Sequence, residues 1–103
     1  MMRNFRTYSL AVEFYRLCST LTLPRHLKEQ LFRAAQSIAL NLCEGRGRPT
    51  VKDQVRFFHI AMGSVRECQG ILILAQMQHT FAWTKLDRLA AHLYRLIEKA
   101  NGG

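Results

Sequence analysis

Four polar residues recur along one helical segment and are the first candidates for chemistry. The row consists of Arg33, Ser37, Asn41 and Glu44. At about 100° per residue in a helix, all four lie within about 80° of one another and form one stripe. Glu44 stands near the predicted end of that helix, where the helix dipole disfavours a negative charge. We therefore expect the Glu44 carboxylate to have a cationic partner.

The candidate partners of Glu44 are Arg33, Arg48 and Arg66, and Glu67 could join the same network. We interpret these residues as a structural ion and hydrogen-bond cluster at a helix or subunit interface. The rival interpretation is a catalytic carboxylate pair, but no His, Ser or Cys accompanies the carboxylates in a convincing position. The sequence therefore predicts a protein that is not an enzyme and that needs no cofactor.

A short basic segment, Gly45-Arg46-Gly47-Arg48, follows the polar row. It resembles a phosphate-binding loop, because free backbone N–H groups and two Arg side chains could cradle an anion. It lacks the Lys-Ser/Thr pair that follows the glycines of a Walker P-loop. The alternative interpretation is a helix C-terminus with Gly45 at the C′ position, followed by a tight turn.

A row of basic side chains marks the last predicted helix. Its members are Lys85, Arg88, His92, Arg95 and Lys99, which step by 3, 4, 3 and 4 residues. On a helix this spacing gives one row about 20 Å long. Such a row could follow a phosphate backbone. The alternative is a solvated face opposite the core, which is common on amphipathic helices.

A second mixed stripe lies on the preceding predicted helix. It contains Lys52, Arg56, His59, Gly63, Arg66 and Gly70. Each Gly inside a helix costs about 1 kcal/mol relative to Ala, so such glycines usually indicate that another backbone approaches closely. Gly63-Ser64 resembles helix-packing sequence, which favours a protein interface here over a nucleic-acid backbone.

The composition of the chain favours an anionic partner. The 103 residues are the length of a single domain. The net charge is +8, and 11 of the 15 basic residues are Arg. Arg binds phosphate and carboxylate through a planar fork of donors. The surplus of basic over acidic residues predicts affinity for nucleic acid or an anionic surface and carries no information about the fold.

The cysteines and the apolar runs argue against zinc, secretion and a membrane. Cys18, Cys43 and Cys68 form no CxxC and lie in apolar segments, so we expect three reduced core residues of a cytoplasmic protein. No two Cys or His have the spacing of zinc ligands. The N-terminal residues lack the apolar run of a signal peptide, and the longest apolar run, residues 71–75, is too short to span a bilayer.

The elements that must position these residues are four helices. We expect them over about residues 5–20, 24–44, 51–78 and 84–100. Pro24 and Pro49 fall where helices should begin, and no strand pattern is present. Thr50 and Thr84 are the expected N-caps of the last two helices. Short connections then predict an all-α, up-down-up-down antiparallel four-helix bundle.

The first two helices carry more apolar surface than one core requires. The apolar side chains of residues 5–20 cover well over half of the helix circumference, whereas a helix in a monomeric bundle needs a much narrower face. In the second helix Phe32 and Leu40 point away from the predicted core face. The sequence therefore predicts a second packing partner, most simply another subunit.

Taken together, these segments resemble one protein family. The shared residues are Arg33-Ala34-Ala35, Ser37-Ile38, Asn41, Glu44-Gly45 and Arg48, then Phe57-Phe58, Ile60-Ala61, Gly63-Ser64 and Glu67. They are similar to those of the four-helix-bundle proteins encoded by intervening sequences of bacterial large-subunit ribosomal RNA genes. The resemblance covers roughly residues 5–100. Leu40 and Leu42-Cys43 depart from the usual family pattern, which affects the local packing of the polar row.

The resemblance implies a homopentamer with no known catalytic activity and with an association with RNA or another nucleic acid. A more distant resemblance, to accessory proteins of diversity-generating retroelements, implies an adaptor whose partner is a reverse transcriptase. We expect RNA contacts at Arg46 and Arg48 and along the basic row that runs from Lys85 to Lys99. We expect structural or interface roles for Arg33, Ser37, Asn41, Glu44, Gly63, Ser64 and Glu67.

Overall fold

The computed structural model describes residues 5–102. Their helices are α1 (Arg6–Cys18), α2 (Arg25–Arg46), α3 (Val51–Leu74) and α4 (Phe81–Gly102). No strand occurs between residues 5 and 102. The predicted all-α class is therefore confirmed.

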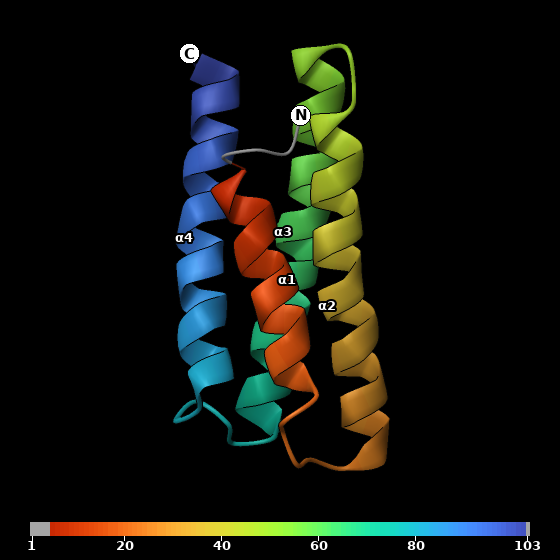
Figure 1. The fold of residues 1–103 in the computed structure, drawn as a ribbon, viewed down its shortest axis with the longest axis vertical. Coiled ribbons are helices and arrows are strands. Elements are labelled where there is room, and N and C mark those ends of the chain that lie inside the picture. Colours follow the sequence, from red (N-terminus) through yellow and green to blue (C-terminus); the bar gives the residue numbers. More distant parts are fainter. Residues whose placement is uncertain (1–4, 103) are drawn as a thin grey trace.

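The helices form a ring in which each one packs against two others. α1 contacts α2 and α4, and α3 contacts the same two helices; the most extensive contact joins α2 to α3. The connections α1–α2 and α3–α4 lie at one end of the bundle, and the α2–α3 connection lies at the other (Figure 1). Successive helices therefore run in opposite directions, as predicted for an up-down-up-down bundle.

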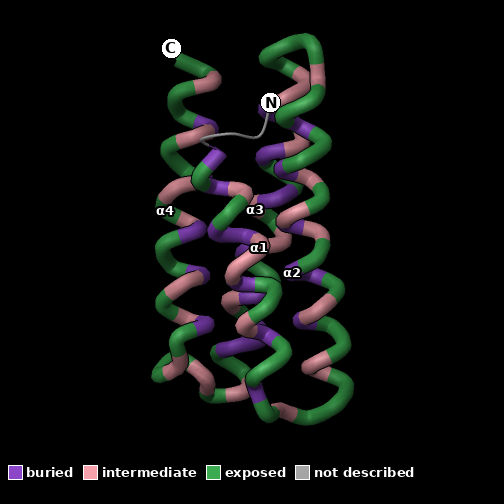
Figure 2. The backbone as a smooth tube through the Cα atoms, viewed as in Figure 1, coloured by how far each residue is buried: buried purple, intermediate pink, exposed green. Residues whose placement is uncertain are grey.

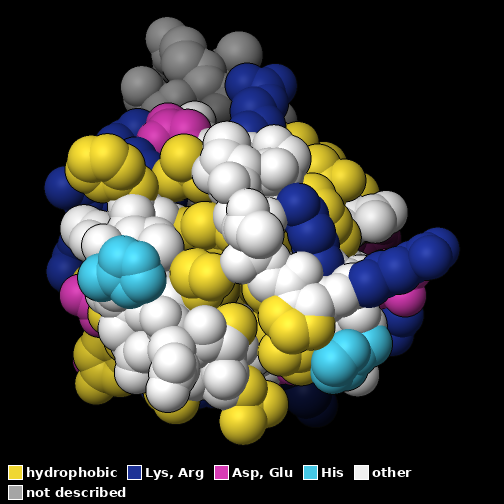
Figure 3. Space-filling model, turned by 90° about the horizontal axis from the view of Figure 1, so that it is seen from below, with side chains coloured by type: hydrophobic (Ala, Val, Ile, Leu, Met, Phe, Trp, Pro, Cys, Tyr) yellow, Lys and Arg dark blue, Asp and Glu magenta, His cyan; other side chains and the backbone are white. Residues whose placement is uncertain are grey.

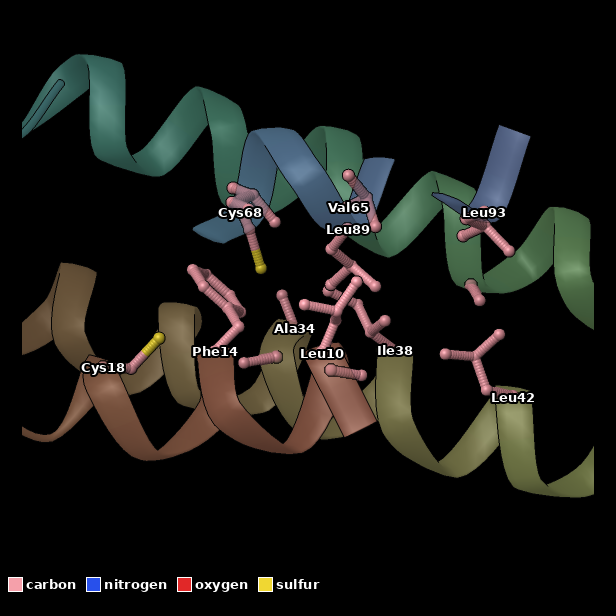
Figure 4. Packing of buried hydrophobic residues seen from close by; sticks show 14 of the residues in the cluster. Leu10, Phe14, Cys18, Ala34, Ile38, Leu42, Val65, Cys68, Leu89 and Leu93 are labelled. Carbon is pink, nitrogen blue, oxygen red and sulfur yellow. The ribbon is translucent and has the colours of Figure 1, made fainter. Parts of the chain in front are cut away.

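The core is built from one buried stripe per helix. Buried positions face the interior of the bundle along its length, and exposed positions face outward (Figure 2). Phe14 of α1, Ile38 of α2, Val65 of α3 and Leu89 of α4 are each fully buried, and their side chains converge between the helices (Figure 4). Burying one such side chain contributes about 1.5–3 kcal/mol, so these stripes supply the main driving force for the fold.

Two threonines cap the last two helices. Thr50 Oγ1 accepts a hydrogen bond from the Asp53 N–H at 3.2 Å, which confirms the predicted cap of α3. The predicted start of α4 at Thr84 is wrong. Thr80 Oγ1 accepts from the Trp83 N–H at 3.3 Å instead, and α4 begins at Phe81. The earlier start adds a turn that buries Ala82 in the core.

The predicted end of α2 at Gly45 is also wrong. Gly45 is buried inside the helix, which continues to Arg46 and is followed by Gly47 as the C-cap. A Cβ atom at Gly45 would lie 2.8 Å from Cε1 of Phe58 and 3.0 Å from Cβ of Phe57. Gly45 is therefore required by the close approach of α2 to α3 and not by the conformation of a helix end.

The end of α3 lies at Leu74, four residues before the predicted end at Gln78. Gln76 has a φ of 57°. The Gln76 N–H donates to the Ile73 carbonyl at 3.0 Å, and the Met77 N–H donates to the Leu72 carbonyl at 2.8 Å. This is a Schellman motif with Gln in place of the usual Gly, which is why the sequence signal for the helix end was missed.

Two of the three cysteines lie in the core. Cys18 and Cys68 are buried, but Cys43 is exposed on α2, so the prediction of a core position is wrong for Cys43. Burial raises the pKa of the Cys18 thiol to about 12, and burial also raises the pKa of Cys68. Because the thiolate is the reactive form, Cys18 and Cys68 are structural side chains.

Gly45 and Gly63 both lie inside helices, but we expect their replacement by alanine to change the free energy of unfolding in opposite directions. We expect Gly45→Ala to lower the free energy of unfolding by about 1–3 kcal/mol, because the new methyl group meets the buried Phe58 ring. Apart from the neighbouring backbone of α3 itself, no described atom lies within 4 Å of a Cβ at Gly63. Gly63→Ala should therefore raise the free energy of unfolding by up to about 1 kcal/mol through helix propensity. Thermal and urea unfolding of the two variants measure both effects, and destabilisation of equal size would contradict this packing.

Candidate nucleic-acid interface

The Glu13 carboxylate of α1 pairs with one cation of its own helix and with one cation of α4. Lys85 Nζ of α4 donates to Glu13 Oε1 of α1 at 2.7 Å, and Arg6 Nη1 lies 3.6 Å from Glu13 Oε2. The hydrogen bond from Lys85 lowers the pKa of Glu13, and the charges of Lys85, Arg6 and Arg88 lower it further. Glu13 therefore stays ionised and joins α1 to the basic row of α4.

The rest of the predicted row continues along α4 on the C-terminal side of Lys85. Arg88, Arg95 and Lys99 are exposed, and none of them has an ion-pair partner within residues 5–102. Desolvation lowers the pKa of His92, and the charges of Arg95, Arg6 and Arg88 lower it further. The positive charges of Arg6 on α1 and of Arg88 and Arg95 on α4 therefore all disfavour protonation of His92. Among these basic side chains, Glu13 pairs with Arg6 and Lys85.

Arg6 was not among the candidates that sequence reasoning selected for this surface. The sequence alone shows that Arg6 and Glu13 are two helical turns apart and share a face of the first helix. The contact with Lys85 could not be derived from that spacing alone. It depends on α4 being the neighbour of α1 and on the rotation of both helices.

The predicted phosphate-binding loop has a different geometry. The Gly47 and Arg48 N–H groups donate to the carbonyls of Glu44 and Gly45 at 3.2 and 3.1 Å. These donors are occupied, so the expectation of free N–H groups is wrong. The Arg46 guanidinium lies over the Phe5 ring, 4.9 Å from its centre.

Arg48 instead fastens the end of α2 to the start of α3. Its Nη2 lies 2.8 Å from Glu44 Oε2, and its Nε lies 3.5 Å from Asp53 Oδ2. The same guanidinium stacks on Phe57, 4.7 Å from the ring centre. Of the three partners expected for Glu44, the structure selects Arg48. Whether Arg48 also contacts RNA stays a prediction.

In the predicted polar row, Ser37 and Asn41 form hydrogen bonds with each other, whereas Arg33 stands apart from them. Asn41 Nδ2 donates to Ser37 O at 2.9 Å and to Ser37 Oγ at 3.1 Å, and Ser64 Oγ donates to Ser37 Oγ at 2.8 Å. The Ser64–Ser37 bond joins α2 to α3, and the two bonds from Asn41 lie within α2. Arg33 and Glu67 are exposed and make no ion pair within the described part of the chain. The expected single network with Glu67 is therefore absent there.

The mixed stripe of α3 is open. Apart from the neighbouring backbone of α3 itself, no heavy atom of residues 5–102 lies within 4 Å of a Cβ at Gly63 or Gly70, so the expected close approach of another backbone does not occur among the described residues. Arg56 Nε lies 3.1 Å from Asp53 Oδ1, and Arg66 Nη1 donates to Gln69 Oε1 at 3.1 Å. An interface role for Gly63 and Ser64 between subunits stays a prediction.

An apolar hollow lies between α1 and α2. It is lined by Val12, Tyr15, Gln36, Ala39 and Leu40. The Tyr15 ring packs edge-on against Phe32, with 5.5 Å between ring centres, and Leu40 is 58% exposed. The apolar surplus expected from the sequence is therefore visible on this face of the single chain.

The described residues offer neither a metal site nor a membrane-spanning helix. No group of three or more His, Cys, Asp and Glu side chains within residues 5–102 could hold a metal ion. None of the four helices in that range is both long and apolar enough to cross a membrane.

The comparisons with known proteins give one match. The family model described as "23S rRNA-intervening sequence protein" matches residues 5–102. The match includes all four helices and therefore both the α1/α4 and the α2/α3 groups described above. A search of curated proteins gives no match to this chain.

The lowered pKa of His92 predicts a pH-dependent stability. As the pH falls through about 6.5, the unfolded chain takes up a proton at His92 that the folded chain resists, so the free energy of unfolding falls. We expect His92→Gln to flatten the fall of the melting temperature between about pH 7.5 and pH 5.5. The matched control is His79→Gln, which removes an exposed histidine from the α3–α4 connection. Equal pH profiles for the two variants would contradict this interpretation.

Proposed function

Because this chain belongs to the family of 23S rRNA-intervening sequence proteins, we propose that it is a non-enzymatic RNA-binding protein. It assembles as a homo-oligomer in the cytoplasm and contacts RNA mainly through phosphates. The observation that carries this proposal is the basic surface of α1 and α4. Arg88, Arg95 and Lys99 lie exposed on it without carboxylate partners in the described residues.

Phosphate binding fits the chemistry of these side chains. An Arg that already has a carboxylate partner must lose it, or share it, to bind a phosphate. Arg48 and Arg56 have such partners, whereas Arg88 and Arg95 have none among residues 5–102. We therefore place the principal contacts on α4, with Lys99 at the far end of the row. Arg46 and Arg48 would have an additional role at the α2–α3 connection.

Homo-oligomer formation fits the apolar face of α1 and α2. Tyr15 and Leu40 remain exposed beside the hollow between these helices, where a second subunit could cover them. We propose a pentamer, following the resemblance described above. Five copies at +8 each would bring about +40 to one particle, so several weak phosphate sites would act together.

Light scattering tests the assembly and the RNA partner in one experiment. We expect nuclease-treated protein to have a mass near five protomers and to form a larger complex with a structured RNA at low salt. High salt should dissociate that complex, because phosphate binding releases counterions. A monomer that does not respond to RNA would overturn the proposal. A complex with a reverse transcriptase that survives salt, without RNA binding by the protein alone, would favour an adaptor instead.

Substitution on α4 tests the location of the contacts. We expect Arg88→Ala with Arg95→Ala to weaken binding of all RNA sequences alike and to reduce the salt slope by roughly 1.5 to 2. The control is Lys52→Ala with Arg66→Ala on α3, which removes the same charge from another face. Fluorescence anisotropy over a salt series measures both slopes. An equal loss in the two double variants would show that only the net charge matters.

A further inference from the structure

Phe81 is the most exposed large hydrophobic side chain in the described part of the chain. It is the first residue of α4, and 84% of its surface is exposed. A single exposed apolar residue is ordinary, but the surroundings of this one are not. Phe81 lines a hollow together with Leu17, Thr84, Lys85 and Arg88. An apolar ring therefore lies next to two cations of the α4 basic row.

This hollow continues along the contact between α1 and α4. A second hollow is lined by Glu13, Arg16, Leu17 and Lys85, so the two share Leu17 and Lys85. We call the combined surface the Phe81 groove. Its carboxylate, Glu13, is paired with Lys85 and Arg6. Figure 3 looks onto the end of the bundle where Phe81 begins α4, and hydrophobic side chains and Lys or Arg side chains both reach that surface.

We propose that the Phe81 groove binds an unpaired RNA base, which stacks on the Phe81 ring while the neighbouring phosphates lie against Arg88 and Arg16. Sites for single-stranded nucleic acid combine an aromatic platform with a cationic track, and both are present here. Bases inside a duplex are already stacked, so such a site selects a loop, a bulge or a single strand. The inference rests on the proposed function and specifies the part of an RNA that is recognised.

The charges of the groove argue against a second copy of this chain as its occupant. Another copy would bring a net charge of +8 towards Arg16, Lys85 and Arg88. Four of its carboxylates already have cationic partners in their own chain: Glu13, Glu29, Glu44 and Asp53. The phosphates of RNA supply the opposite charge without breaking those pairs.

The burial of α4 argues against a membrane surface. A helix that binds a bilayer exposes a continuous apolar face to it. The apolar stripe of α4 lies inside the bundle: Ala82, Leu86, Leu89, Leu93 and Ile97 are all buried. One exposed ring beside cations provides a stacking platform and not an insertion face.

A fluorescent base tests the stacking directly. The probe is an RNA hairpin with 2-aminopurine in its loop, compared with a loop-free duplex of the same stem. We expect wild-type protein to quench the loop base and to bind the hairpin more tightly than the duplex. Phe81→Ala should weaken hairpin binding by about 5- to 100-fold, abolish quenching and leave duplex binding unchanged. Phe81→Trp should retain the quenching.

Leu74→Ala is the matched control, because Leu74 is a second exposed apolar side chain, 74% exposed, at the end of α3. It should bind the hairpin like wild type. Hairpin binding that is unaffected by Phe81→Ala would overturn this inference while leaving the proposed function intact. A wild-type protein that binds neither RNA would overturn both. A change of oligomeric mass in Phe81→Ala, with normal quenching, would assign the ring to a protein interface and would also overturn the inference.

Discussion

The rest of the bundle depends on the close approach of α2 to α3 at Gly45. The absence of a side chain there lets the Phe58 ring lie against the α2 backbone, where a methyl group would be only 2.8 Å from Cε1. Arg48 holds the same end through Glu44 and Asp53, and the hydrogen bond from Ser64 to Ser37 continues the contact along the pair. α1 and α4 pack across this α2–α3 pair. Their meeting brings Arg6, Glu13 and Lys85 together.

Periodicity was sufficient to predict the number of helices, their order and the basic row of α4, because these features depend on residues within one element. The predicted helix ends were wrong where two residues could each cap the same helix, or where a contact between helices determined where a helix ends. Thr80 and Thr84 can both cap a helix, and the burial of Ala82 favours Thr80. Gln76 adopts the left-handed conformation that the sequence pattern assigns to Gly. Glycine is typical of a helix end, but Gly45 lies inside α2 and allows the Phe58 ring to pack against the helix. The start of α4 also explains why Phe81 was overlooked, since a start at Thr84 leaves it in a loop.

The two candidate surfaces of the chain differ in chemistry and share α1. On one side of α1, Glu13 and Arg16 line a hollow with Lys85 of α4. On the other side, Val12 and Tyr15 line an apolar hollow with Leu40. A helix of only thirteen residues therefore contributes to both. This arrangement accounts for the broad apolar coverage of α1 in the sequence, because one face serves the core, a second lines the apolar hollow and a narrow polar strip remains for the charged surface.

The order in which the helices pack also has a kinetic consequence. Three of the four packed pairs join helices that are consecutive in the chain, and only the α1–α4 pair joins its two ends. Local pairs close at low entropic cost, whereas the α1–α4 pair requires closure of the longest loop. The basic surface and the Phe81 groove lie on this last pair. They therefore exist only in the completed ring, and any polyanion bound there stabilises the closed chain against opening of α1.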